Sequence, residues 1–331
     1  MGEVVFREQA PFRKMDILHD GGEETKAKFI IAMVTHHPES MEHMAELVRK
    51  NNVKTLILED SPKSLMEVIE GKKTAQAHVR EFILKETNGE VDLEKNPDAY
   101  LLPRLASYKR RCELLEGLKR DMPDLKIVIL DPYYNKDVLG PRGETYEERM
   151  KLERGISDDV TRMQYAMANR DFRGALEHAK DIAKNIAKQI STIDEMRANA
   201  IADGSYAGNV LVEAGEGHIS MQKNLERNLK DNPVSVMLAN KRIMEKVFKA
   251  DENFYPPLLQ LAHQYITKGD AIDKNSESLL AARACAAAIN FEQESERLLK
   301  EGKRMNAQKD YELIKAANSL SFDDCKKISI G

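Results

Sequence analysis

Four short apolar runs, each rich in β-branched residues and bounded by polar residues or glycine, constrain the fold of this chain most. They cover residues 29–34, 53–59, 126–131 and 209–214. Near-continuous apolar runs of this length are typical of strands buried on both faces, the pattern of a parallel sheet. Long stretches with helical periodicity separate them, which is typical of α/β proteins. We therefore expect a central, mostly parallel sheet of about four or more strands, wrapped by many helices.

The intervals between the runs carry the periodicity of helices. Residues 38–50 begin with proline, which is well tolerated at the first helical position, and complete a compact strand–helix–strand unit. Residues 171–203 place apolar side chains at spacings of three and four along one long amphipathic helix. From about 219 to 318 the pattern predicts helices alone, and the tail 319–331 is expected to be loosely ordered.

The 331 residues are enough for one large domain or two ordinary ones. The pattern predicts a polar leader at 1–26, an α/β domain with helical insertions at 27–230, and a helical C-terminal region at 231–331. Whether that last region packs on the α/β domain or stands apart is left open, and no oligomeric state is indicated.

Composition excludes several classes of protein. The net charge is −4, from 51 Lys and Arg against 55 Asp and Glu, which argues against a general nucleic-acid binder. Three cysteines without a CxxC pair fit a reducing compartment. No apolar run is long enough to span a membrane, and the first residues have no apolar signal-peptide core, so a cytoplasmic location is expected.

Side chains with chemical potential follow all four predicted strands. They are Thr35, His36 and His37 after the first, Glu59 and Asp60 after the second, Asp131 after the third, and Glu216 and His218 after the fourth. In open parallel sheets, ligands bind outside the carboxyl ends of the strands. We therefore expect these scattered positions to converge in one crevice.

Two imidazoles and a carboxylate can form the first shell of a divalent transition metal such as zinc, manganese or cobalt. The candidate ligands are His36, His37, Glu59 and His218. His36 and His37 are adjacent, so on an extended chain only one of them is expected to face the crevice. The same residues without a metal can act as acid and base on a water molecule.

Four motifs occur in a recognisable order along the chain. They are Val34-Thr35-His36-His37, Leu56-Ile57-Leu58-Glu59, Arg197-Ala198-Asn199-Ala200-Ile201-Ala202 and Gly215-Glu216-Gly217-His218-Ile219. This order resembles that of the TraB, Tiki, ChaN and erythromycin-esterase superfamily over roughly residues 27–230. The chain departs from the family's pattern at Val34 and Met221, where glycine is usual, and at Ala198, where an acidic or amide residue is usual.

The resemblance implies a central sheet wrapped by helices and a site built from two histidines, a glutamate and an arginine. In this sequence these are His37 (or His36), His218, Glu59 and Arg197. Members of the superfamily include metal-dependent peptidases, esterases that open macrolactones and haem-binding lipoproteins. Because one fold hosts several functions, the resemblance leaves the function open.

The leading hypothesis is a hydrolase of amide or ester bonds in a peptide or small molecule, with His37 (or His36), Glu59 and His218 around a metal or an activated water. Arg197 would bind an anionic substrate group or the developing oxyanion. One alternative is a ChaN-type haem- or metal-binding protein without turnover, although the chain has no tryptophan to stack on a porphyrin. The other is a non-catalytic protein whose helical residues 231–318 bind a partner.

Overall fold

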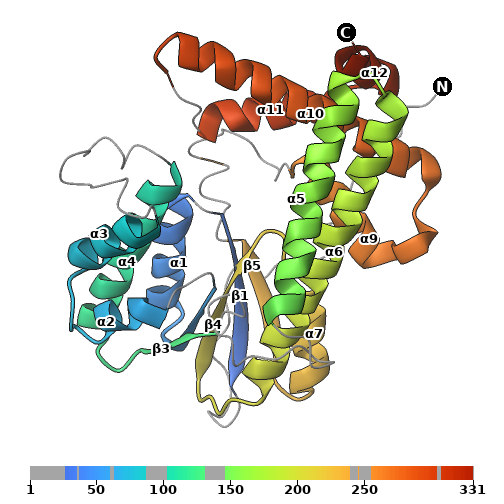
Figure 1. Cartoon of the computed structure of the whole chain (residues 1–331). Helices are drawn as coiled ribbons and strands as arrows, with labels where there is room; N and C mark the ends of the chain where they lie inside the picture. Colours follow the sequence, from blue (N-terminus) through green and yellow to red (C-terminus); the bar gives the residue numbers. More distant parts are fainter. Residues whose placement is uncertain are drawn as a thin grey trace. The chain divides into compact units, whose positions relative to one another are not determined.

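The computed structural model describes residues 27–35, 37–59, 63–86, 103–130, 146–238, 245, 255–303 and 307–330. These residues fall into two compact units, one within 1–135 and 197–240 and the other within 136–196 and 241–331 (Figure 1). The predicted leader, 1–26, lies outside the described residues. None of the described helices is long and apolar enough to cross a membrane.

The first unit is an α/β unit whose described strands all run parallel. In chain order it contains β1 (Lys28–Val34), α1 (Pro38–Lys50), β2 (Val53–Leu58), the 3-10 turn η1 (Lys63–Leu65), α2 (Met66–Ile69), α3 (Ala75–Glu86), α4 (Pro103–Asp121), β3 (Lys126–Ile129), the end of α6 (Phe172–Ala202), β4 (Asn209–Gly215), α7 (Met221–Leu229) and β5 (Val234–Leu238). The five strands are ordered β3-β2-β4-β1-β5. Strand β4, the next to last of the five in the sequence, therefore lies at the centre, between β2 and β1.

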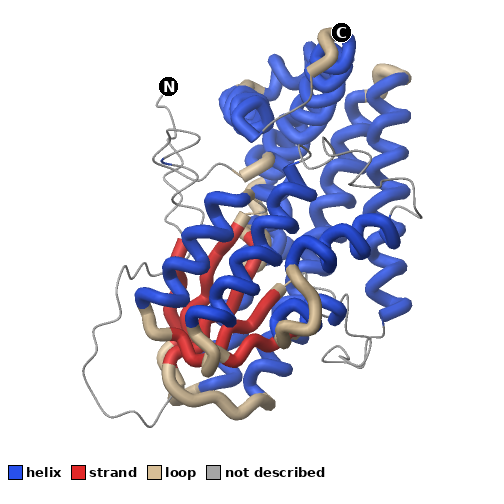
Figure 2. The backbone as a smooth tube through the Cα atoms, turned by 90° about the vertical axis from the view of Figure 1, so that its left-hand side faces the viewer, coloured by secondary structure: helices blue, strands red, loops and turns tan. Residues whose placement is uncertain are grey.

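Helices cover both faces of this sheet (Figures 1 and 2). On one face, Ile30, Leu56 and Leu211 pack against α1, α2, α3 and α4. On the other face, Ile31 and Val212 pack against α7 and the end of α6. Because successive residues of a strand point to opposite faces, a strand covered on both sides must be apolar at nearly every position. This is why the strand segments stand out in the sequence.

The connections leave the central strands toward opposite faces. Helix α1, which follows β1, packs on one face, whereas α7, which follows β4, packs on the other. Adjacent parallel strands whose connections diverge in this way form a topological switch point, the usual place of ligand binding in open α/β sheets. The carboxyl ends of β1, β2 and β4 meet there, since Val34 pairs with Gly215 and Ile57 with Val212.

The second unit, in the part that is described, is helical. It contains α5 (Tyr146–Ala168), most of α6, α9 (Pro257–Lys268), the 3-10 turn η3 (Gly269–Ala271), α10 (Lys274–Lys300), α11 (Ala307–Ser319) and α12 (Phe322–Ile330). Its core places small buried residues, among them Ala179 and Ala183 of α6 and Ala281 and Ala284 of α10, in one cluster with Ile182. Side chains this small let neighbouring helices approach closely.

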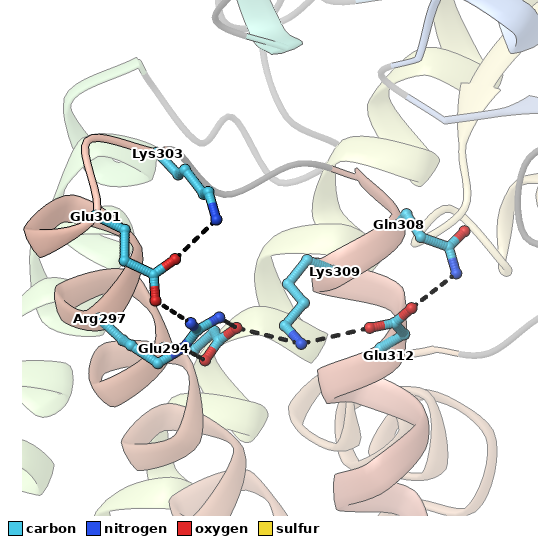
Figure 3. Close-up of polar contacts among 7 residues, drawn as sticks. All are labelled: Glu294, Arg297, Glu301, Lys303, Gln308, Lys309 and Glu312. Carbon is cyan, nitrogen blue, oxygen red and sulfur yellow. Dashed lines mark hydrogen bonds and ion pairs between the residues drawn. The ribbon is translucent and has the colours of Figure 1, made fainter.

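A chain of ionic contacts joins the C-terminal half of α10 to α11 (Figure 3). Glu294 pairs with Arg297 at 2.8 Å and with Lys309 at 3.2 Å, and Lys309 also reaches Glu312 at 3.5 Å. Arg297 pairs in addition with Glu301, which accepts from Lys303. We call these six charged residues the surface network.

The α/β prediction is confirmed, and all four predicted strands are present with bounds that differ by at most two residues. The prediction that only helices follow residue 219 is wrong, because 234–238 form β5. This edge strand is short and Ser235 interrupts its apolar run. The expectation of a loosely ordered tail is also wrong, since Phe322, Cys325 and Ile328 recur at spacings of three and α12 buries Cys325.

Candidate functional site

A tight turn after β4 brings His218 back over the end of the strand. The His218 backbone N–H donates to the Gly215 carbonyl at 3.0 Å, and the Met221 N–H donates to the His218 carbonyl at 3.2 Å as α7 begins. A β-carbon at position 215 would lie 3.5 Å from His218 Cδ2 and 3.6 Å from Glu59 Oε2. Glycine at 215 thus leaves both side chains close to the backbone at the carboxyl end of the sheet.

Glu59 and His218 form the central contact of the site. Glu59 follows β2, and its Oε1 lies 2.6 Å from His218 Nε2. The other carboxylate oxygen, Oε2, accepts a hydrogen bond from the Gly215 N–H. Both side chains are about 15% exposed, so the pair is largely buried yet reachable from solvent. An ionised carboxylate can only accept hydrogen bonds, which places the proton of the neutral imidazole on Nε2.

Arg197 lies behind this pair. Its Nη1 is 3.4 Å from Glu59 Oε1, and its Nη2 donates to the Glu213 carbonyl at 2.6 Å. Its side chain has no exposed surface. The sequence predicts that Arg197 reaches the crevice near His218, and the structure puts the guanidinium on Glu59. Complete burial favours a role in holding Glu59 over direct contact with a substrate.

The surroundings of Glu59 favour its ionised form. Burial by itself raises the pKa of the Glu59 carboxyl, but this effect is outweighed by His218, Arg197 and the Gly215 N–H. The resulting pKa lies well below the ordinary value of 4.5. Glu59 is therefore a carboxylate throughout the neutral range, able to orient and stabilise an imidazolium beside it.

Two further residues, Arg111 and Glu213, join the site. Glu213 is in the middle of β4 and Arg111 is on α4, and their side chains form a buried ion pair. Glu213 Oε2 also accepts from the Glu59 N–H at 3.0 Å, and Arg111 Nη2 donates to the Glu59 carbonyl. The sequence interpretation missed both residues. A glutamate inside an otherwise apolar strand was the available signal for Glu213.

At Glu213 the effect of burial prevails, so the pKa is raised and not lowered. Burial raises the pKa of this carboxyl to about 7, although Arg111 and the Glu59 N–H act to lower it. The negative charge of Glu59 adds to the rise. The site thus holds two glutamates whose pKa values are pushed apart by their surroundings, a feature that is typical of functional sites.

His37 serves as the N-cap of α1. Its Nδ1 accepts the Glu39 N–H at 3.2 Å, which uses one ring nitrogen to satisfy the helix terminus. Burial lowers the pKa of His37, and the charge of Glu39 partly opposes this. Among the described residues, neither Glu59 nor His218 is its hydrogen-bond partner. His36, the other candidate of the first motif, lies outside the described residues.

Among the described residues, the donor set of the site does not fit a metal ion. Both Glu59 oxygens already face protein donors, and His218 Nε2 is directed at Glu59 rather than at a shared third point. Within the described part of the chain, no three His, Cys, Asp or Glu side chains are arranged to hold a metal. Of the predicted metal set, Glu59 and His218 are in contact and His37 caps α1, whereas His36 lies outside the described residues.

Comparisons with known proteins give no relative. No protein-family model matches the chain, and no curated protein and no solved structure matches it significantly.

Proposed function

We propose that this chain is a hydrolase of ester or amide bonds in which Glu59 and His218 activate a water molecule without a metal. The observation that carries the proposal is the 2.6 Å contact between Glu59 Oε1 and His218 Nε2 at the switch point of the sheet. A histidine oriented by a buried carboxylate is a recurrent general base in hydrolases.

The chemistry follows from the tautomer. With the proton of His218 on Nε2 and directed at Glu59, the lone pair of the neutral ring is on Nδ1. Nδ1 takes a proton from water as the water oxygen attacks the carbonyl carbon. When the tetrahedral intermediate collapses, the same proton passes to the departing alkoxide or amine. Glu59 stays ionised and stabilises the transient imidazolium.

Arg197 supports this role through Glu59. Its guanidinium lies 3.4 Å from the carboxylate and is shielded from solvent, so its charge helps to keep Glu59 ionised. The expected role in binding an oxyanion is less well supported, because a fully buried side chain does not meet a ligand that enters from solvent.

The metal-dependent version of the hypothesis finds less support than the metal-free one. A metal ligated by Glu59 would have to displace the hydrogen bond to His218 or the one from Gly215. Ligation through Nδ1 of His37 would remove the cap of α1. No step of the proposed reaction therefore passes through a metal.

Hydrolysis of a panel of p-nitrophenyl esters, a macrolactone and peptide p-nitroanilides tests the proposal, each with and without EDTA. We expect hydrolysis of at least one probe at a rate that EDTA leaves unchanged. Glu59→Gln and His218→Asn should each lower kcat at least about 100-fold, the usual contribution of a general base. His178→Asn, a substitution on α6 in the second unit, is the matched control and should have no effect.

Three results would contradict the proposal. If no probe is hydrolysed, or if His218→Asn keeps full activity, the chain is not a hydrolase that works through this pair. If EDTA abolishes the activity and added zinc, manganese or cobalt restores it, the water is activated by a metal.

A further inference from the structure

The buried ion pair of Arg111 and Glu213 is the most unusual feature that the proposed reaction does not use. The side chains are 6% and 1% exposed, and 102 positions separate them in the sequence. Glu213 faces the sheet side on which α4 packs, where its neighbour on β4, Leu211, belongs to the apolar core. Stability alone does not account for a charged pair in such surroundings, because apolar residues of similar size often stabilise a core as well or better.

The pair makes contacts with the backbone of Glu59 on both sides. Glu213 Oε2 accepts from the Glu59 N–H at 3.0 Å, and Arg111 Nη2 donates both to Glu213 Oε2 and to the Glu59 carbonyl. Strand β2 ends at Leu58, so the residue after it has left the ladder with β4. The ion pair therefore provides hydrogen bonds to the backbone at the point where the regular hydrogen bonds between the strands end.

The same pair is linked to the other members of the site. The Glu213 carbonyl accepts from Arg197 Nη2, and Gly215, two residues further along β4, donates its N–H to the Glu59 carboxylate. Position 213 thus holds the Glu59 backbone through its side chain and Arg197 through its carbonyl. A displacement of about 1 Å in a catalytic group can lower a rate about 100-fold.

We infer that Arg111 and Glu213 are positioning residues, which fix the Glu59 peptide so that its carboxylate meets His218 Nε2. This inference rests on the proposed function for its catalytic consequence, but the position of the Glu59–His218 contact can be measured without any substrate.

The experiment uses the full chain labelled with ¹⁵N-histidine, and reads the imidazole Nε2–H proton of His218 by NMR. His218→Asn assigns that resonance by its disappearance. Two double variants keep the buried charge balanced: Arg111→Met with Glu213→Leu removes both anchors of the Glu59 peptide, whereas Arg111→Met with Glu213→Gln keeps an oxygen that can accept from the Glu59 N–H. Unfolding by urea gives the stability of each.

We expect the Met/Leu variant to fold with stability close to that of the wild type and to lose the hydrogen-bonded Nε2–H resonance. Its kcat on a p-nitrophenyl ester that the wild type hydrolyses should fall at least about tenfold, with a KM change below about threefold. The Met/Gln variant should retain the resonance in part and lie between the two in rate. Should the Met/Leu variant fail to fold, the Met/Gln variant is required to show a weakened resonance and a reduced kcat.

A folded variant that keeps both the resonance and the rate would overturn the inference and leave the pair a purely structural one. Failure of the proposed function gives a different result. If the wild type hydrolyses no ester, the resonance is still present in the wild type and still sensitive to Arg111 and Glu213 when the positioning role holds.

Discussion

Two glutamate–arginine pairs in this chain differ mainly in their exposure to water, and their carboxyl pKa values move in opposite directions. In the surface network, hydrogen bonds from Arg297 lower the pKa of Glu294 to about 2. At the site, burial raises the pKa of Glu213 to about 7 although Arg111 is in contact with it. Arg297 is about half exposed and Glu294 is 15% exposed, whereas Arg111 and Glu213 are 6% and 1% exposed. Both carboxylates meet an arginine. Lys309 adds to the lowering of the pKa at Glu294, whereas burial, with the negative charge of Glu59, raises the pKa at Glu213.

The contrast indicates what each network can do. Exposed ion pairs are screened by water and salt and contribute little to stability. Buried charges lose their hydration, and their mutual attraction only partly offsets that loss. We therefore expect Arg111 and Glu213 to affect the position of Glu59 and the pH dependence of stability. We expect the surface network to affect neither. The predictions below run from the largest expected effect to the smallest.

Glu213→Leu should be the most damaging single substitution. It leaves the Arg111 guanidinium buried without its carboxylate, and arginine cannot escape by losing its proton. We expect a loss of about 3–5 kcal/mol in the free energy of unfolding, measured with urea at pH 8, where Glu213 is ionised. Arg111→Met should cost less, because Glu213 can then take up a proton. An equal loss in the two variants would contradict this asymmetry.

The stability of the wild type should fall relative to Glu213→Gln as the pH rises from about 4.5 to above 7. In this range the folded chain keeps the Glu213 proton that the unfolded chain releases, so rising pH favours unfolding. A pKa of about 7 against an ordinary 4.5 corresponds to about 3 kcal/mol. Glu59 acts in the opposite sense, since its lowered pKa gives stability that is lost as the pH falls below about 4.5. Urea unfolding of both proteins at several pH values measures the difference, and a difference independent of pH would contradict the raised pKa.

Position 215 tests how closely the site is packed. A β-carbon there would be in ordinary contact with His218 and Glu59, so Gly215→Ala should cost less than about 1 kcal/mol. Gly215→Val adds two methyl groups against the same atoms and should cost about 1–3 kcal/mol. It should also weaken the His218 Nε2–H resonance, which alanine should leave in place. If both variants behaved alike, the close packing of the pair over Gly215 would be wrong.

Lys309→Ala gives the smallest effect. Removing this bridge between Glu294 and Glu312 should change Tm by no more than about 1 °C. Any change should shrink further in 0.5 M salt, where exposed charges are screened. A large loss, unaffected by salt, would remove the distinction between the two networks.

The sequence predicted the parts of the site that depend on the sheet. Apolar runs located β1, β2 and β4, and the rule that ligands bind at their carboxyl ends selected a larger set of strand-end residues that includes Glu59 and His218. The resemblance to the TraB, Tiki, ChaN and erythromycin-esterase superfamily implied Arg197, and its side chain is in contact with Glu59, which is in contact with His218. The carboxyl ends of neighbouring parallel strands lie at the same edge of the sheet, however the loops run. This part of the site could therefore be predicted from the sequence.

The remaining parts depend on packing that local sequence does not encode. Arg111 meets Glu213 because α4 shares a core with the sheet face to which position 213 points. His37 follows a predicted strand end, but its side chain caps α1 because its Nδ1 accepts the Glu39 N–H. Strand β5 was missed because an edge strand of five residues can include a polar position such as Ser235.

The protonation state of His218 Nε2 tests the central claim most directly. The claim is that Nε2 donates a hydrogen bond to Glu59 and does not bind a metal. In the ¹⁵N-histidine-labelled chain of 331 residues at pH 7, we predict a protonated Nε2 with a hydrogen-bonded proton, abolished by Glu59→Leu, which removes the acceptor, and unchanged by one equivalent of zinc. A Nε2 that carries no proton, or that loses its proton and shifts when zinc is added, would contradict the account.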